Sequence, residues 1–267
     1  MKKQIIFSFA LLAAFFTTFS SISAQEAPAK KEKSKKESDS NNWNSSSWGG
    51  ERVVGTGDIV TENRGVSGFT GVSSAISADI NLRQSSTFKV LIEGQKNIID
   101  LVETEVKDGT LKVRFKKGYS VNYKKNLKIQ VEAPNFSYLG MSGSGDVRAN
   151  EPLSGEKLDI SISGSGDFDL AQLQYADVKV GISGSGGVDL GGTAERVELS
   201  ISGSGDLKAK NLKAQSVRCR VSGSGDVSCF ATKELDALIS GSGDILYSGN
   251  PTSVKKKVSG SGDIEAR

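Results

Sequence analysis

The chain has 267 residues, and its 34 lysines and arginines are nearly balanced by 31 aspartates and glutamates, which excludes the strongly basic surface of a nucleic-acid-binding protein. The sequence contains no histidine, and this excludes a Ser-His-Asp triad, a Cys-His pair and most zinc sites. A hydrophobic fraction of 36% allows a folded core, and 31 glycines with only 4 prolines indicate many tight turns. We therefore expect neither a nucleic-acid partner nor a cofactor.

Residues 1–24 have the pattern of a secretory signal peptide. A basic start, Met1-Lys2-Lys3, precedes an apolar stretch from Ile5 to Phe19, and Ile22-Ser23-Ala24 then has the small residues of a cleavage site. This predicts export to the periplasm, the outer-membrane surface or the extracellular space. No later run is apolar enough to cross a bilayer, so no transmembrane segment is expected after cleavage.

Residues 25–50 combine five lysines with runs of serine and asparagine, which predicts a disordered tether. Residues 51–141 alternate polar and apolar side chains without a fixed repeat, and we expect an amino-terminal β cap with early coils. Asp108-Gly109 lies between two alternating segments and predicts a hairpin of residues 102–106 and 111–115. Residues 119–123 and 127–131 resemble a second pair, and residues 54–58 a degenerate early corner.

Residues 142–267 repeat one five-residue motif, Ser-Gly-Ser-Gly-Asp. Copies begin at Ser142, Ser163, Ser202, Ser222, Ser240 and Ser259, and a seventh at Ser183 ends in Gly187 instead of aspartate. Successive copies are 18 to 21 residues apart. This spacing is too short for a propeller blade, which needs about 40 residues.

Apolar residues alternate on both sides of every motif, as in Leu158, Ile160 and Ile162 before the copy at Ser163. Alternation with period two indicates strands with one buried face. A repeat of this length buries that face only by stacking on its neighbours. The sequence therefore predicts an all-β fold, a single-stranded parallel β-helix of about seven coils with SGSGD corners. We expect the corner glycines to adopt positive φ, and the Ser and Asp side chains to accept hydrogen bonds from nearby turn N–H groups.

Several segments together resemble the putative auto-transporter adhesin family with a head GIN domain. They are Gly68-Phe69-Thr70-Gly71-Val72, residues 97–101, residues 104–113 and the first motif at residues 142–146. The resemblance covers roughly residues 52–267. It implies an exported, right-handed β-helix of bacterial envelopes and supplies no catalytic residues.

The motif aspartates would form a row along one corner if the coils stack. A cation such as Ca²⁺ could relieve their mutual repulsion, whereas the alternative is a row of turn-capping carboxylates that face water. The aspartates of this row are Asp146, Asp167, Asp206, Asp226, Asp244 and Asp263.

Two other functions remain open at this stage. A polar strip at the corners could bind a glycan, although Trp43 and Trp48 fall in the predicted tether and only Tyr175 is expected outside an inward position of the repeats. Paired acids such as Asp167 and Asp169 could serve a polysaccharide-acting enzyme, but acids that recur at every corner do not mark one active site. The leading hypothesis is a structural or adhesive envelope protein whose partner is a cell-surface polysaccharide or another envelope protein.

The only two cysteines, Cys219 and Cys229, flank one corner at inward positions. Export to an oxidising compartment would allow them to form a disulfide. The alternative is a pair of buried free thiols that act as small apolar side chains.

Overall fold

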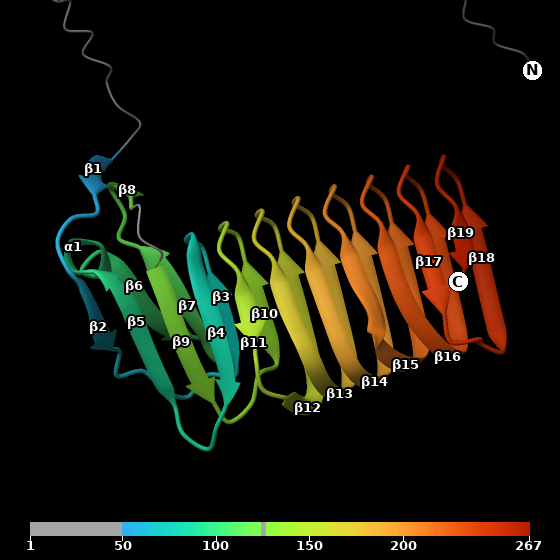
Figure 1. Cartoon of the computed structure of the whole chain (residues 1–267), viewed down its shortest axis with the longest axis horizontal. Coiled ribbons are helices and arrows are strands. Elements are labelled where there is room, and N and C mark those ends of the chain that lie inside the picture. Colours follow the sequence, from blue (N-terminus) through green and yellow to red (C-terminus); the bar gives the residue numbers. More distant parts are fainter. Residues whose placement is uncertain (1–49, 124–126) are drawn as a thin grey trace, which may run out of the picture. The chain divides into compact units, whose positions relative to one another are not determined.

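The computed structural model describes residues 50–123 and 127–267, all within one compact unit, Ser46–Arg267. The predicted signal peptide, and all of the predicted tether except Gly50, lie outside the described residues. The fold is all-β, with 64% strand and 2% helix. It is a β-solenoid of about six turns (Figure 1), close to the predicted seven coils.

The repeat region forms the long part of the solenoid, and every strand in it pairs in parallel with strands of a neighbouring coil. The long strands bend and follow more than one side of a coil, which is why a single strand spans up to 15 residues. The strands are β10 (Tyr138–Met141), β11 (Val147–Ala149), β12 (Leu153–Ile162), β13 (Phe168–Ile182), β14 (Val188–Ile201), β15 (Leu207–Val221), β16 (Val227–Ile239), β17 (Ile245–Ser248), β18 (Ser253–Val258) and β19 (Ile264–Ala266).

The core of the solenoid consists of columns of apolar side chains, each column taking one residue from every coil. One of these columns is Ile162, Ile182, Ile201, Val221 and Ile239, and every member is at most 2% exposed. The alternation in the sequence thus places the predicted residues inside. Because backbone hydrogen bonds run from coil to coil, the stability of each coil depends on its neighbours.

The amino-terminal part builds two early coils and the cap that covers them. Its elements are β1 (Glu51–Val54), β2 (Ile59–Asn63), β3 (Gly71–Ser74), β4 (Ala78–Gln84), β5 (Lys89–Gln95), α1 (Lys96–Ile99), β6 (Val102–Lys107), β7 (Thr110–Phe115), β8 (Tyr119–Asn122) and β9 (Leu127–Ala133). The predicted hairpin is confirmed as β6 and β7, whose turn holds Asp108 and Gly109 at φ values of 51° and 70°.

The order of the early coils in space differs from their order in the chain. Strands β3 and β4 lie between β7 and β9 on one side and β10 and β11 on the other. The predicted pairing of residues 119–123 with 127–131 is wrong, because β8 pairs with β1 while β9 pairs with β4 and β5. The cap is antiparallel, since β5 runs against both β2 and β9.

The first corner of the stack is also not where the sequence suggested. Val54 ends β1, residues 55–58 form the loop that follows it, and this segment does not stack on the solenoid corners. The segment between β3 and β4 takes this place, because the carbonyls of Ile76 and Ala78 lie against Gly143 and Gly145 of the first SGSGD motif.

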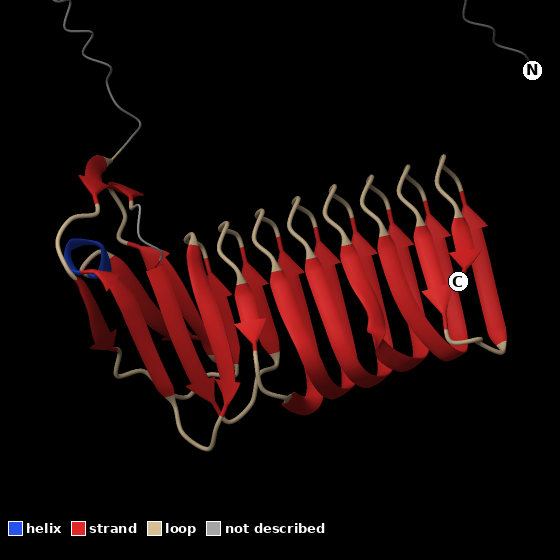
Figure 2. Cartoon of the chain, in the orientation of Figure 1, coloured by secondary structure: helices blue, strands red, loops and turns tan. Residues whose placement is uncertain are grey.

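The SGSGD corners line up along one edge of the solenoid (Figure 2). The prediction of positive φ at these glycines is wrong, since none of them is among the positive-φ residues of the described chain. A Cβ at Gly223 would instead lie 1.9 Å from the carbonyl oxygen of Gly203 in the preceding coil, and equivalent positions give 1.8–2.2 Å. Glycine is required because successive corner backbones approach too closely to admit any side chain.

Candidate functional site

The six predicted aspartates do form one row along the solenoid corners, interrupted at Gly187. Four of the carboxylates, those of Asp167, Asp206, Asp226 and Asp244, accept hydrogen bonds from the backbone of the next coil, and not from their own turn as predicted. Asp226 N–H donates to Asp206 Oδ1 at 3.0 Å, and Asp244 N–H donates to Asp226 Oδ1 at 2.8 Å. Asp263 and Gly187 donate in the same way to Asp244 and Asp167. The row therefore connects consecutive coils.

This bonding gives the aspartate row a structural role that needs no metal. Asp146, the first member, pairs instead with the Arg148 guanidinium at 2.6 Å. Within residues 50–123 and 127–267, no group of three or more acidic or cysteine side chains has the arrangement of a metal site. Calcium binding by the row stays the alternative hypothesis, which a comparison of thermal stability with and without Ca²⁺ would test.

A shallow hollow lies where Gly187 interrupts the row. Asp167 and Asp169, the pair considered for catalysis, line it together with Asp189 and Asp206. Asp167 already accepts the Gly187 N–H at 2.6 Å.

Tyr175, the one repeat aromatic expected outside an inward position, is buried instead. It is 4% exposed, and its hydroxyl donates to the Phe136 carbonyl at 3.0 Å. Burial raises the pKa of Tyr175 to about 12. Its register partners are Gly155 and Ala194, whose small size leaves room for the ring. Tyr175 thus cannot stack on a sugar, and Trp43 and Trp48 lie outside the described residues.

A feature that the sequence analysis missed is a ladder of alternating charge on one outer side of the solenoid. Successive coils place an acid and a base in turn at one register position, in the order Asp159, Lys179, Glu198, Arg218, Asp236 and Lys255. The position two residues earlier on each strand gives a second column: Lys157, Asp177, Arg196, Ser216, Glu234 and Ser253. We call these two columns the charged face. The alternation becomes visible in the sequence only when successive repeats are aligned in the register that the strands adopt.

Neighbouring members of the charged face form ion pairs. Arg196 Nε lies 2.5 Å from Asp177 Oδ1, and this hydrogen bond lowers the pKa of Asp177. Lys179 and Glu198 form a longer pair at 3.9 Å. Unlike charges in adjacent coils favour the observed register, because a slip that juxtaposed like charges would be unfavourable.

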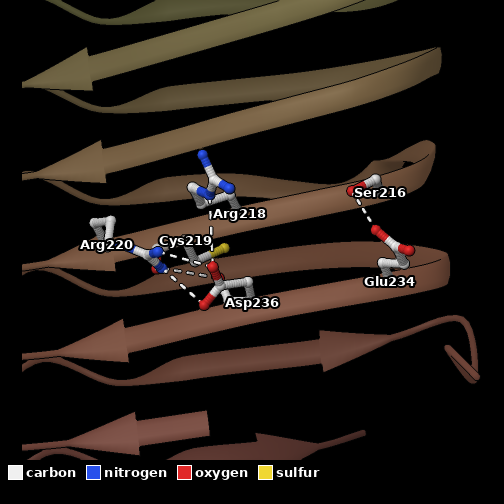
Figure 3. Close-up of polar contacts among 6 residues, drawn as sticks. All are labelled: Ser216, Arg218, Cys219, Arg220, Glu234 and Asp236. Atoms are coloured by element: carbon white, nitrogen blue, oxygen red, sulfur yellow. Dashed lines mark hydrogen bonds and ion pairs between the residues drawn. The ribbon is translucent and has the colours of Figure 1, made fainter. Parts of the chain in front are cut away.

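The carboxylate of Asp236 is held by two arginines of the preceding coil (Figure 3). Arg220 Nη2 donates to Oδ2 at 2.8 Å, and Arg218 Nε lies 3.5 Å from the same oxygen. The bond from Arg220, more than the surrounding positive charge, lowers the pKa of Asp236. Beside them, Ser216 Oγ donates to Glu234 at 3.5 Å.

The charged face encloses an elongated hollow of about 540 Å³. Its lining begins at Lys157 on β12, ends at Lys255 on β18, and includes residues of β13, β14, β15 and β16 between them. The hollow thus crosses six successive coils and runs along the solenoid axis. Its volume exceeds that of the hollow beside Gly187, which is about 370 Å³.

Comparison with known proteins places this architecture in a family. The model of the family described as "Putative auto-transporter adhesin, head GIN domain" matches residues 68–251. The chain belongs to this family. None of the curated proteins matches it. The described residues contain no helix that is long and apolar enough to cross a membrane.

Several solved structures share the fold of this chain. A putative adhesin from Bacteroides fragilis is 31% identical with a TM-score of 0.78, and the match covers 80% of this chain and all of that one. A putative lipid binding protein from Parabacteroides distasonis is 27% identical with a TM-score of 0.69, covering 81% of this chain and all of the other. A putative adhesin from Parabacteroides merdae is 26% identical with a TM-score of 0.61, covering 81% and 99%.

Proposed function

We propose that this chain is an exported cell-envelope protein that binds an extended partner along its charged face and catalyses no reaction. The observation that carries this proposal is the shape of the hollow, which crosses six coils along the solenoid axis. A polymer chain presents similar groups at regular intervals, and a surface that repeats at every coil, roughly 4.8 Å apart, is suited to such a ligand. The partner is a cell-surface polysaccharide or another envelope protein.

The chemistry of the charged face favours a polar partner. Its two columns contain five basic and five acidic side chains, so it offers donors and acceptors of both signs with no net charge. Such a surface selects by the pattern of charges and not by bulk attraction. One similar structure is described as a lipid-binding protein, but the lining of this hollow is too polar for us to propose an apolar ligand.

The proposal is tested by neutralising cations of the charged face without leaving a buried charge. Lys179, Arg218 and Lys255 are changed to glutamine together, and Asp236 keeps its bond from Arg220 in this variant. The labelled full chain is titrated onto source cells that lack its gene, with polysaccharide extracted from the same envelope as competitor. We expect binding to weaken by about tenfold or more, equivalent to about 1.4 kcal/mol.

A matched control changes Lys208, Lys210 and Lys213 to glutamine. All three are exposed on β15, outside the charged face, and the change in net charge is the same. Equal loss of binding in both triple variants would indicate general electrostatic attraction. Full binding by the charged-face variant would show that the partner binds elsewhere.

A further inference from the structure

The two cysteines lie opposite each other inside the solenoid. Cys219 on β15 and Cys229 on β16 flank the corner at residues 222–226, and they are 0% and 1% exposed. The Cys219 thiol donates to Cys229 Sγ, with 3.8 Å between the sulfur atoms. A disulfide requires about 2.05 Å, so the sulfur atoms, now 3.8 Å apart, must approach by less than 2 Å.

The neighbouring coils show why this position accepts a bridge. In the coil before, the two equivalent positions hold Leu199 and Ala209, and in the coil after they hold Ala237 and Tyr247. In each of these two neighbouring coils, a large side chain and a small one thus occupy the two positions. The cysteine coil replaces that combination with two side chains of intermediate size, each of which has an alanine as one register neighbour.

We propose that Cys219 and Cys229 form an intrachain disulfide when the chain folds in an oxidising compartment. This inference rests on the export included in the proposed function. In the reaction, one thiolate attacks an external disulfide, such as that of a thiol-oxidising protein or of oxidised glutathione. The second thiolate then displaces that carrier. Two protein thiols become one S–S bond, and the external disulfide is reduced to two thiols, which take up the two protons that the cysteines lose.

The surroundings of the pair indicate when the bond forms. The hydrogen bond to Cys229, followed by burial, raises the pKa of Cys219 well above its ordinary value. A protonated, buried thiol reacts slowly, since the thiolate is the nucleophile. Oxidation therefore occurs while the coil is still open, and the finished bond is shielded from soluble reductants.

The test is refolding of the full chain in vitro, which does not depend on export. The denatured, reduced chain is refolded in a mixture of oxidised and reduced glutathione or in reductant alone. Each sample is then unfolded, alkylated without reduction and weighed by mass spectrometry. We expect the chain refolded in glutathione to take up no alkylating reagent and to have a mass lower by two hydrogens than the unmodified reduced chain. The chain refolded in reductant should take up two equivalents of the reagent.

Two further measurements keep the inference open to refutation. Cys229→Ala, refolded in the same mixture, must take up one equivalent of reagent once any attached glutathione has been removed. The oxidised wild type must keep the sheet signal that the reduced chain shows by circular dichroism. Uptake of two equivalents after glutathione refolding, or a bond formed only with loss of that signal, would overturn the proposal. A protein that forms the bond in vitro but is not exported would refute the proposed function alone.

Discussion

A single methyl group at a corner glycine should separate two coils. In Gly223→Ala the new Cβ would lie 1.9 Å from the Gly203 carbonyl oxygen, whereas Cβ atoms essentially never come within 3.0 Å of another heavy atom. The two corners must therefore move apart by at least about 1 Å. The hydrogen bond from Ser224 N–H to the same carbonyl, at 3.1 Å, would then be lost.

The cost of this separation combines two contributions. Forcing an extra carbon into a packed site costs typically 1–3 kcal/mol, and each lost inter-coil hydrogen bond adds about 1 kcal/mol. We expect Gly223→Ala to lower the free energy of unfolding by about 2–4 kcal/mol, measured by urea denaturation. A matched control is Gly181→Ala, where no atom lies within 4 Å of the added Cβ and φ is not positive. That variant should be unchanged or more stable by about 0.5 kcal/mol.

Asparagine substitutions separate close approach from backbone conformation. Gly109 has φ +70° and open space around the added Cβ, and asparagine tolerates that conformation. Gly109→Asn should therefore cost less than about 1 kcal/mol, whereas Gly223→Asn should cost at least as much as Gly223→Ala. If Gly223→Ala were as harmless as Gly181→Ala, the close stacking of corner backbones would be refuted.

Three further predictions concern the carboxylates and Tyr175. Because four of the six corner carboxylates already accept backbone hydrogen bonds, millimolar Ca²⁺ in place of EDTA should change Tm by less than about 1 °C, and a rise of many degrees would reveal a metal ladder. Because the pKa of Asp236 is lowered in the folded chain, its ionised carboxylate stabilises the fold at pH values above the ordinary carboxyl pKa of 3.8. This stabilisation is lost as the pH falls through the lowered pKa. Asp236→Asn should thus cost up to about 1 kcal/mol at pH 7, discounted for exposure, and equal stability of variant and wild type at pH 7 would contradict this. Tyr175→Phe should lower the free energy of unfolding by about 1 kcal/mol, because the hydrogen bond to Phe136 is lost. The wild type should lose stability as the pH rises from about 10 to 12, because Tyr175 ionises at a lower pH in the unfolded chain than in the folded chain. An absorbance titration in which every tyrosine ionises near pH 10 would refute the burial of Tyr175.

Much of the solenoid could be predicted because its signals are local and repeated. The SGSGD copies marked the corners, and the alternation around Ile160 and Ile162 placed the buried face. The Asp108-Gly109 turn likewise contains its own conformational signal. These features depend on residues close together in the chain, and their recurrence removes ambiguity.

The features that sequence analysis missed depend on contacts between coils. The reason for glycine at Gly223 is a carbonyl 20 residues earlier in the chain, and the position of Tyr175 depends on the space left by Gly155. Strands β3 and β4 lie between strands that come later in the chain, and no periodic pattern in the sequence indicates this position. The charged face was hidden for the same reason, since residues such as Asp177 and Arg196 become neighbours only in the correct register.

Export to the cell envelope is the claim on which the proposed binding role most directly depends. A tag at the carboxyl end of the full chain can be probed with antibody in intact source cells, after permeabilisation of the outer membrane, and after lysis. We predict that the tag is detected in intact or permeabilised cells, while a cytosolic marker is detected only after lysis. Detection of the tag only after lysis, together with the marker, would place the protein in the cytosol and contradict the account.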